Sequence, residues 1–122
     1  MIVLDSSALI ELINGSEKGK RVQDIINKEV VGITTLTVHE VGVGIPENKY
    51  TQFREFLSRF VILPFDEAAS IESVRIEKHL TKSGGMIGRF DILIAAICFV
   101  QHSIIYSFDA DFKKVHGLQV IL

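Results

Sequence analysis

The segment Ile2-Val3-Leu4-Asp5-Ser6-Ser7 carries the strongest indication of the fold. Residues 2–5 include a run of branched apolar side chains, which is typical of a strand buried on both faces. The serines that follow predict the start of a short helix, which Asn14-Gly15 ends. A buried strand that passes directly into a helix is the repeating unit of parallel sheets, so this segment predicts an α/β protein.

The rest of the chain continues this alternation of strands and helices. Further strands are predicted at 30–34, 61–65, 104–107 and 119–122, and further helices at 17–28, about 35–45, 48–60, 67–83 and 91–101. The last of these helices is apolar nearly all round, which predicts burial between layers. Right-handed crossovers then give a three-layer α/β/α fold with a central parallel sheet of about five strands, in one domain over residues 1–122.

The composition is that of a folded domain without a strong charge. The 122 residues are 48% hydrophobic and carry a formal net charge of -2, so no overall basic field attracts nucleic acid. The single cysteine, Cys98, lies in an apolar run, and we expect an inert core thiol in a reducing compartment. Without a basic N-terminal region or a membrane-spanning run, the sequence predicts a cytoplasmic protein with no membrane partner.

Several acidic residues are expected to meet at the carboxyl edge of the sheet, where parallel sheets keep their sites. Converging carboxylates repel one another, and a divalent metal ion resolves that repulsion. An all-oxygen set of ligands selects Mg²⁺ or Mn²⁺ over zinc, and the zinc, phosphate-loop, dinucleotide and serine-hydrolase motifs are absent from the sequence. The acids that follow predicted strands or open the apolar helix are Asp5, Glu40, Asp91, Asp109 and Asp111.

Each acid also has a purely structural interpretation. Asp5 can cap the helix that follows it, and Asp91 can lie favourably at a helix N-terminus. Thr37-Val38-His39-Glu40 matches a capping box, which this segment alone favours for the glutamate. Asp109 and Asp111 can belong to a loop turn. These interpretations leave unexplained why all of the acids fall at the same edge of one sheet.

The chain resembles a PIN domain over essentially its whole length, and most closely the toxin ribonucleases of VapBC toxin–antitoxin pairs. Val3-Leu4-Asp5-Ser6-Ser7 is similar to the family's opening strand, and Glu40 with Gly44 matches its Glu-x-x-x-Gly. The segments 85–96 and 107–112 resemble the family's most specific motif and its close, with Ser107 where threonine is more common. Four such motifs in order predict a PIN-like fold.

The resemblance implies a metal-dependent endoribonuclease that uses Mg²⁺, with Mn²⁺ as the alternative. It implies that Asp5 and Asp91 are the principal metal ligands and that Glu40 and Asp109 complete the metal shell. Asp111 is the alternative to Asp109 as the fourth acid or shares its role, and Ser7 is expected in a supporting position. The nearby basic residues Arg89 and Lys113-Lys114 are candidates for holding flanking RNA phosphates.

The implied partners are an RNA substrate, an antitoxin and a second copy of the chain. A stripe of apolar side chains marks the helix at 48–60, and its neighbouring positions predict a homodimer with a groove for an antitoxin helix. An arginine or lysine of that helix is expected to enter the acidic site. The stripe consists of Phe53, Phe56, Leu57 and Phe60.

Two other functions fit parts of the pattern. A nuclease of the same fold that acts in RNA maturation or decay needs no antitoxin, although the small size of the chain favours the toxin. A receiver domain, phosphorylated on an aspartate, would need a lysine after a late strand. Ser107-Phe108-Asp109 stands in that region instead.

Overall fold

Five parallel strands form the sheet, as predicted, and β1 lies at its centre. The computed structural model describes residues 1–121, so Leu122 of the predicted strand 119–122 lies outside the described residues. The strands follow the order β3-β2-β1-β4-β5, and Leu4 is in register with Ile33 on one side and Tyr106 on the other. They are β1 (Ile2–Leu4), β2 (Val31–Thr34), β3 (Val61–Leu63), β4 (Ile104–Tyr106) and β5 (Val120–Ile121).

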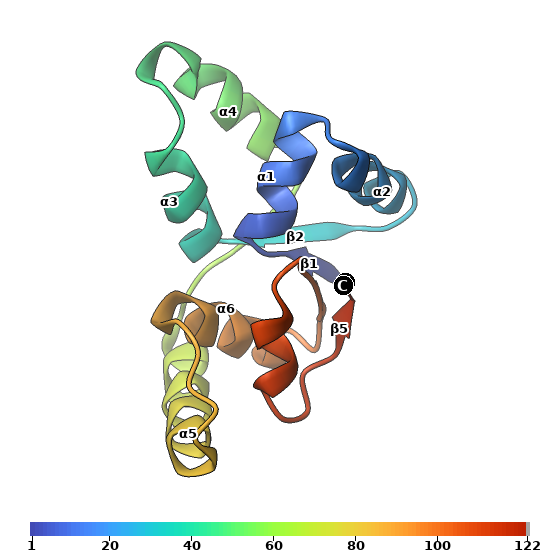
Figure 1. Ribbon diagram of the computed structural model, residues 1–122. Coiled ribbons are helices and arrows are strands. Elements are labelled where there is room, and N and C mark those ends of the chain that lie inside the picture. The colour runs from blue at the N-terminus through green and yellow to red at the C-terminus, as the bar shows by residue number, and fades with distance from the viewer. Residues whose placement is uncertain (122) are drawn as a thin grey trace.

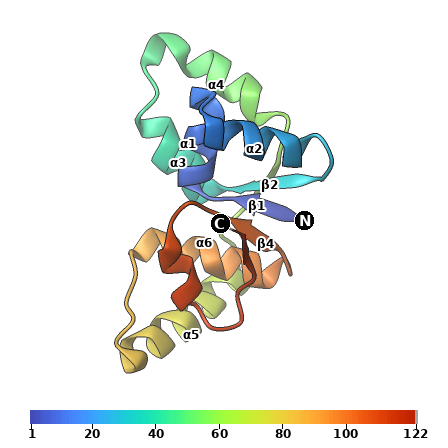
Figure 2. The ribbon, with the colours of Figure 1, turned by 45° about the vertical axis from the view of Figure 1, so that its right-hand side comes forward.

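Helices cover both faces of the sheet and complete the predicted three layers (Figures 1 and 2). One layer holds α1 (Ser6–Asn14), α2 (Glu17–Ile26), α3 (Thr35–Val43), the short 3-10 helix η1 (Glu47–Lys49) and α4 (Tyr50–Leu57). The other layer holds α5 (Glu67–Ser83), α6 (Arg89–Val100) and the 3-10 helix η2 (Ala110–Lys114).

Alternating side chains of the strands feed two cores. Leu4 and Tyr106 pack with α1 to α4, whereas Val3 and Ile105 pack with α5 and α6. Helix α6 is buried between the sheet and α5, in agreement with its apolar sequence. Cys98 is one of its buried residues. Burial raises the pKa of the Cys98 thiol to about 12, which suits an inert core residue. Within residues 1–121, no helix combines the length and hydrophobicity needed to span a bilayer.

Some predicted boundaries are wrong by a few residues, for local stereochemical reasons. The third strand ends at Leu63 rather than at 65, because Pro64 has no N–H to donate to a sheet ladder. The predicted helix at 48–60 is divided into η1 and α4, yet Phe53, Leu57 and Phe60 are buried as a helical stripe requires. A Cβ at Gly42 would lie 3.4 Å from the Phe53 ring, so this glycine lets α4 pack closely against α3.

Candidate active site

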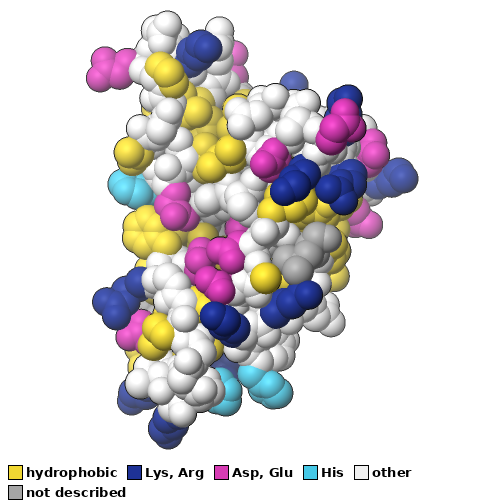
Figure 3. All heavy atoms as spheres, viewed as in Figure 1, with side chains coloured by type: hydrophobic (Ala, Val, Ile, Leu, Met, Phe, Trp, Pro, Cys, Tyr) yellow, Lys and Arg dark blue, Asp and Glu magenta, His cyan; other side chains and the backbone are white. Residues whose placement is uncertain are grey.

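Acidic side chains gather at the carboxyl edge of the sheet, between the two helical layers (Figure 3). Asp5 directly follows β1, and Asp109 follows β4, the strand beside it. The chain leaves β1 for β2 on one side and later returns to β4 on the other, so the strand order reverses at this point. Ligands of open parallel sheets bind at such reversals. Glu40 comes from α3 and Asp91 from the first turn of α6.

Asp5 is the most firmly held of the acids and is only 3% exposed. Its Oδ1 accepts the Ala8 N–H at 2.9 Å, which caps α1, and also the Ser7 hydroxyl at 2.7 Å. Its Oδ2 accepts the Ser107 hydroxyl at 2.6 Å. The predicted cap is therefore real, but it uses only one of the two carboxylate oxygens. Three donors offset much of the free energy that burying this carboxylate costs.

Two serine hydroxyls connect the loops after β1 and β4. Ser7 Oγ accepts the Phe108 N–H at 2.9 Å, and Ser107 Oγ accepts the Asp109 N–H at 2.8 Å. The position of Asp109 is thereby coupled to that of Asp5. Ser107 is fully buried and was not among the predicted site residues. The signal that could have identified it is a hydroxyl directly after a buried strand, next to the strand that ends at Asp5.

Glu40 lies on α3 with its side chain turned toward α1. Its Oε1 accepts the Ser6 hydroxyl at 2.7 Å. The capping-box interpretation of this glutamate is wrong, because α3 starts earlier than that motif requires. Thr34 is the N-cap, and its hydroxyl accepts the Thr37 N–H at 3.2 Å. Glu40 therefore falls beyond the first turn, where its carboxylate is free to face the acidic edge.

Asp109 and Asp111 share the start of η2 but have different partners. Asp109 Oδ1 accepts the Asp111 N–H at 2.9 Å, so Asp109 caps this 3-10 helix. The Asp111 carboxylate lies 3.2 Å from the Lys114 ammonium, and its side chain is 43% exposed. Asp109 is thus tied to the buried serine network, whereas Asp111 is partly neutralised at the surface.

The negative charges of the other four acids act on the pKa of Asp91. Burial is the largest cause that raises its pKa, to about 6, and the charges of Asp109, Glu40, Asp5 and Asp111 raise it further, in that order. Burial also raises the pKa of Asp5, against the hydrogen bonds that it accepts. These shifts have the direction expected where carboxylates crowd together without a cation. The structure therefore places Asp5, Glu40, Asp109 and Asp111 near enough to Asp91 for their charges to act on it.

Apart from Lys114, which pairs with Asp111, nearby basic side chains do not neutralise these acids. Arg89 precedes Asp91 by two positions, but its guanidinium pairs with Glu77 of α5, Nε to Oε1 3.2 Å. Among residues 1–121 no ion pair involves Asp5, Glu40, Asp91 or Asp109. In the same part of the chain, no three His, Cys, Asp or Glu side chains lie close enough to hold a metal ion in their present rotamers. The all-oxygen donor set nevertheless has the chemistry that hard divalent cations prefer.

The family model described as PIN domain matches residues 2–118, and this chain belongs to the PIN-domain family. Ribonuclease VapC1 of Rickettsia felis is 30% identical over 127 residues, covering 98% of this chain and 94% of that protein. The tRNA(fMet)-specific endonuclease VapC of Shigella flexneri is 27% identical over 123 residues, covering 96% of this chain and 93% of that protein. The predicted resemblance to VapC ribonucleases is confirmed, and the activity that this family brings is that of a nuclease.

Solved structures share the fold over the full length. VapBC-1 from nontypeable Haemophilus influenzae superposes with a TM-score of 0.86 at 19% identity, covering 99% of this chain and 97% of the solved one. At this level of identity the likeness establishes the architecture alone. It confirms the predicted PIN-like arrangement of the sheet and its two helical layers.

Proposed function

We propose that this chain is a metal-dependent endoribonuclease that hydrolyses RNA phosphodiester bonds as the toxin of a VapBC-type pair. The observation that carries the proposal is the convergence of Asp5, Glu40, Asp91 and Asp109 at the point where the strand order reverses. The curated relatives named as VapC endonucleases support the same activity. The single free cysteine fits a reducing compartment such as the cytoplasm.

The four acids are proposed as the holders of a Mg²⁺ ion, with Mn²⁺ as the alternative. When bound, such an ion supplies a hydroxide-like nucleophile at neutral pH and offsets charge that develops on the phosphate. Asp5 is the preorganised member, because Ser7 and Ser107 fix the directions of both of its oxygens. Asp91 has a pKa of about 6, so it is mostly ionised at neutral pH and is able to bind a cation.

The direct test is cleavage of a mixed RNA by the purified chain. We expect products with Mg²⁺ or Mn²⁺ and none in excess chelator, with activity restored when the metal is added back, since the acids need a cation to approach a phosphate. Calcium serves as a matched control, because it binds oxygen ligands but prefers longer distances and looser geometry. Equal cleavage in chelator and in Mg²⁺ would contradict the metal role.

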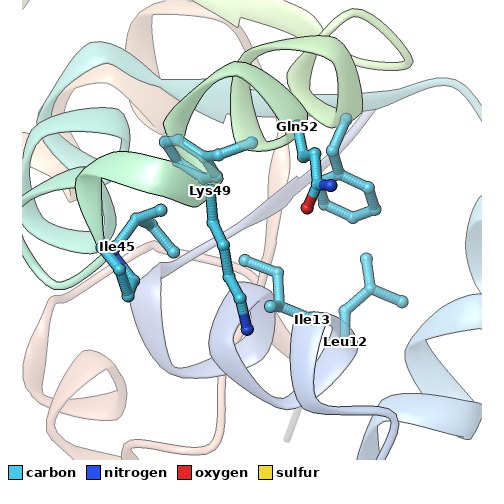
Figure 4. Close-up of a pocket in the computed structure, with 8 residues that line it drawn as sticks. Leu12, Ile13, Ile45, Lys49 and Gln52 are labelled. Carbon is cyan, nitrogen blue, oxygen red and sulfur yellow. The ribbon is translucent and has the colours of Figure 1, made fainter.

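The antitoxin is proposed to bind an apolar hollow of about 260 Å³ between α1 and α4 (Figure 4). Leu12 and Ile13 line it from α1, and Lys49 extends over it. A second hollow of about 250 Å³ shares Ile13 and Ile45 with the first and reaches Glu40. Together, the two hollows extend from α4 to Glu40 at the acidic site. Its shape suits an amphipathic helix whose arginine or lysine neutralises the acidic cluster.

We also propose that the chain forms a homodimer. Apolar side chains remain exposed away from the hollow, on the edge strand β3 and on α5. Val61 is 45% exposed, Ile71 65% and Val74 53%. Burying apolar side chains of this kind against a second copy stabilises a two-fold assembly.

Light scattering measures both partnerships in one experiment. The chain alone is expected to have the mass of two copies at micromolar concentration, and the mass should rise when the product of an adjacent small open reading frame, as a candidate antitoxin, is added. Ile13→Glu should keep the first mass and lose the second, because it puts a charged side chain where the apolar face of an antitoxin helix would have to be buried. Val30→Glu, at a site 65% exposed and outside the hollow, is the matched control. A single-copy mass contradicts the dimer, and unimpaired binding by Ile13→Glu contradicts the groove.

A further inference from the structure

Phe90 is the one phenylalanine of the eight in this chain that joins neither hydrophobic core. The other seven are buried in a core or pack against it, whereas the Phe90 side chain is 38% exposed. It stands in the first turn of α6, directly before Asp91. A polar side chain at this helix position would avoid the exposure of an aromatic ring to water. Packing in the cores therefore gives no reason for this phenylalanine.

His39 places a second aromatic ring beside it. The two ring centroids are 6.0 Å apart and the ring planes meet at 69°, which is an edge-to-face contact. His39 is exposed on α3 and directly precedes Glu40, just as Phe90 directly precedes Asp91. The pair therefore spans the boundary between α3 and α6 at the margin of the acidic site. Figure 3 shows exposed hydrophobic surface next to the gathered acidic side chains.

We propose that Phe90, positioned by the His39 ring, stacks against an unpaired base of the RNA next to the phosphate that the acids hold. This inference rests on the proposed ribonuclease function and adds a base-stacking subsite to it. The Phe90 side chain is 38% exposed beside the His39 ring, so part of its ring is open to solvent, and every nucleobase has a flat face to place there.

The charge of the molecule explains why such a contact is needed. The net charge of the chain is -2. Unless a metal ion offsets their charge, the acids at the site repel the phosphates of the RNA. Stacking supplies affinity for RNA that does not depend on a basic groove. A base reaches an aromatic ring only when it is unstacked from its neighbours, so this subsite selects loops and single strands over duplex RNA.

The test uses a short single-stranded RNA whose cleavage position has first been mapped with the wild-type chain. Phe90→Ala should raise KM for this RNA about tenfold, the scale of one lost stacking contact, and Phe90→Trp should keep or lower it. In a second series, each nucleotide beside the cleavage position is replaced in turn by an abasic residue. At one of these positions the replacement should raise the KM of the wild type by a similar factor. Phe90→Ala should be insensitive to that replacement. Val30→Ala, at a side chain 65% exposed just before β2 and so at the end of that strand opposite the acidic edge, is the matched control.

The outcomes separate this inference from the function on which it rests. If the wild type cleaves no RNA with metal, the proposed function itself fails. If it cleaves and Phe90→Ala has the same KM as the wild type, or if every abasic replacement raises the KM of Phe90→Ala as much as that of the wild type, the stacking subsite is refuted. Normal RNA kinetics with lost antitoxin binding would also refute it, and would assign Phe90 to the protein interface instead.

Discussion

Asp91→Asn is expected to lower the rate of RNA cleavage more than about a hundredfold while the fold stays intact. Removing an outer-shell partner of a metal ligand typically lowers metal affinity or activity by about 10–100-fold. Loss of a ligand itself should lower the activity further. An amide is a poor ligand for a hard cation, and among residues 1–121 no side-chain hydrogen bond to the Asp91 carboxylate is found. The measurement is the initial rate of RNA cleavage in Mg²⁺. Asp24→Asn, an exposed aspartate on α2, is the matched control. Full activity of Asp91→Asn would refute the site.

The same variant should be at least as stable as the wild type when metal is absent. Because the pKa of Asp91 is raised from 3.8 to about 6, its neutral form is favoured in the folded state. The stability that this preference contributes is fully present below pH 3.8 and is lost as the pH rises through about 6. The amide of Asp91→Asn stays neutral, so its advantage in chelator should be small near pH 4 and on the order of 1 kcal/mol at neutral pH.

Melting curves in chelator and in excess Mg²⁺ measure this difference. Mg²⁺ should raise the melting temperature of the wild type by linkage and do much less for the variant. If Asp91→Asn instead melts well below the wild type in chelator, and Mg²⁺ leaves the wild type unmoved, then Asp91 serves the helix N-terminus. The metal assignment would then lose its main support.

Asp5 should show two separable roles when it is changed to asparagine and to alanine. Asp5→Asn keeps a side-chain oxygen for the Ala8 N–H, so it should fold with nearly wild-type stability and still fail to cleave RNA. Asp5→Ala leaves the Ala8 N–H and the buried Ser107 hydroxyl without their acceptor. It should lose about 2–3 kcal/mol of unfolding free energy, the combined scale of a lost cap and an unsatisfied buried donor.

Chemical denaturation and the RNA assay, run on both variants, decide between these roles. An Asp5→Ala protein as stable as the wild type would contradict the structural role. A fully active Asp5→Asn would contradict the metal role. The sequence presented cap and ligand as alternatives, but the carboxylate has two oxygens. Oδ1 accepts hydrogen bonds from the helix N-terminus and the Ser7 hydroxyl, while Oδ2 accepts one from Ser107, directly after the neighbouring strand.

Much of the fold was predictable because its causes are local. The apolar run of β1, the all-round apolar α6 and the stripe of α4 each follow from side chains a few positions apart, where periodicity reports burial directly. Parallel order follows from the alternation of strands and helices, and it brings the residues after each strand to one edge. The sequence therefore determined that Asp5 and Asp109 follow strands whose carboxyl ends share an edge, and that Asp91 opens a buried helix.

What the tertiary structure decided is which groups meet once that edge is assembled. Ser107 reaches Asp5 across 102 positions, and Ser6 reaches Glu40 across 34. Neither pairing has a local pattern, because it depends on strand order and on the exact start of α3. The pKa of Asp91 and the contact of Phe90 with His39 likewise arise from elements far apart in the chain. Hydrogen bonds and charges act over a few ångströms of space, so only the packed arrangement of β1, β4, α3 and α6 could set them.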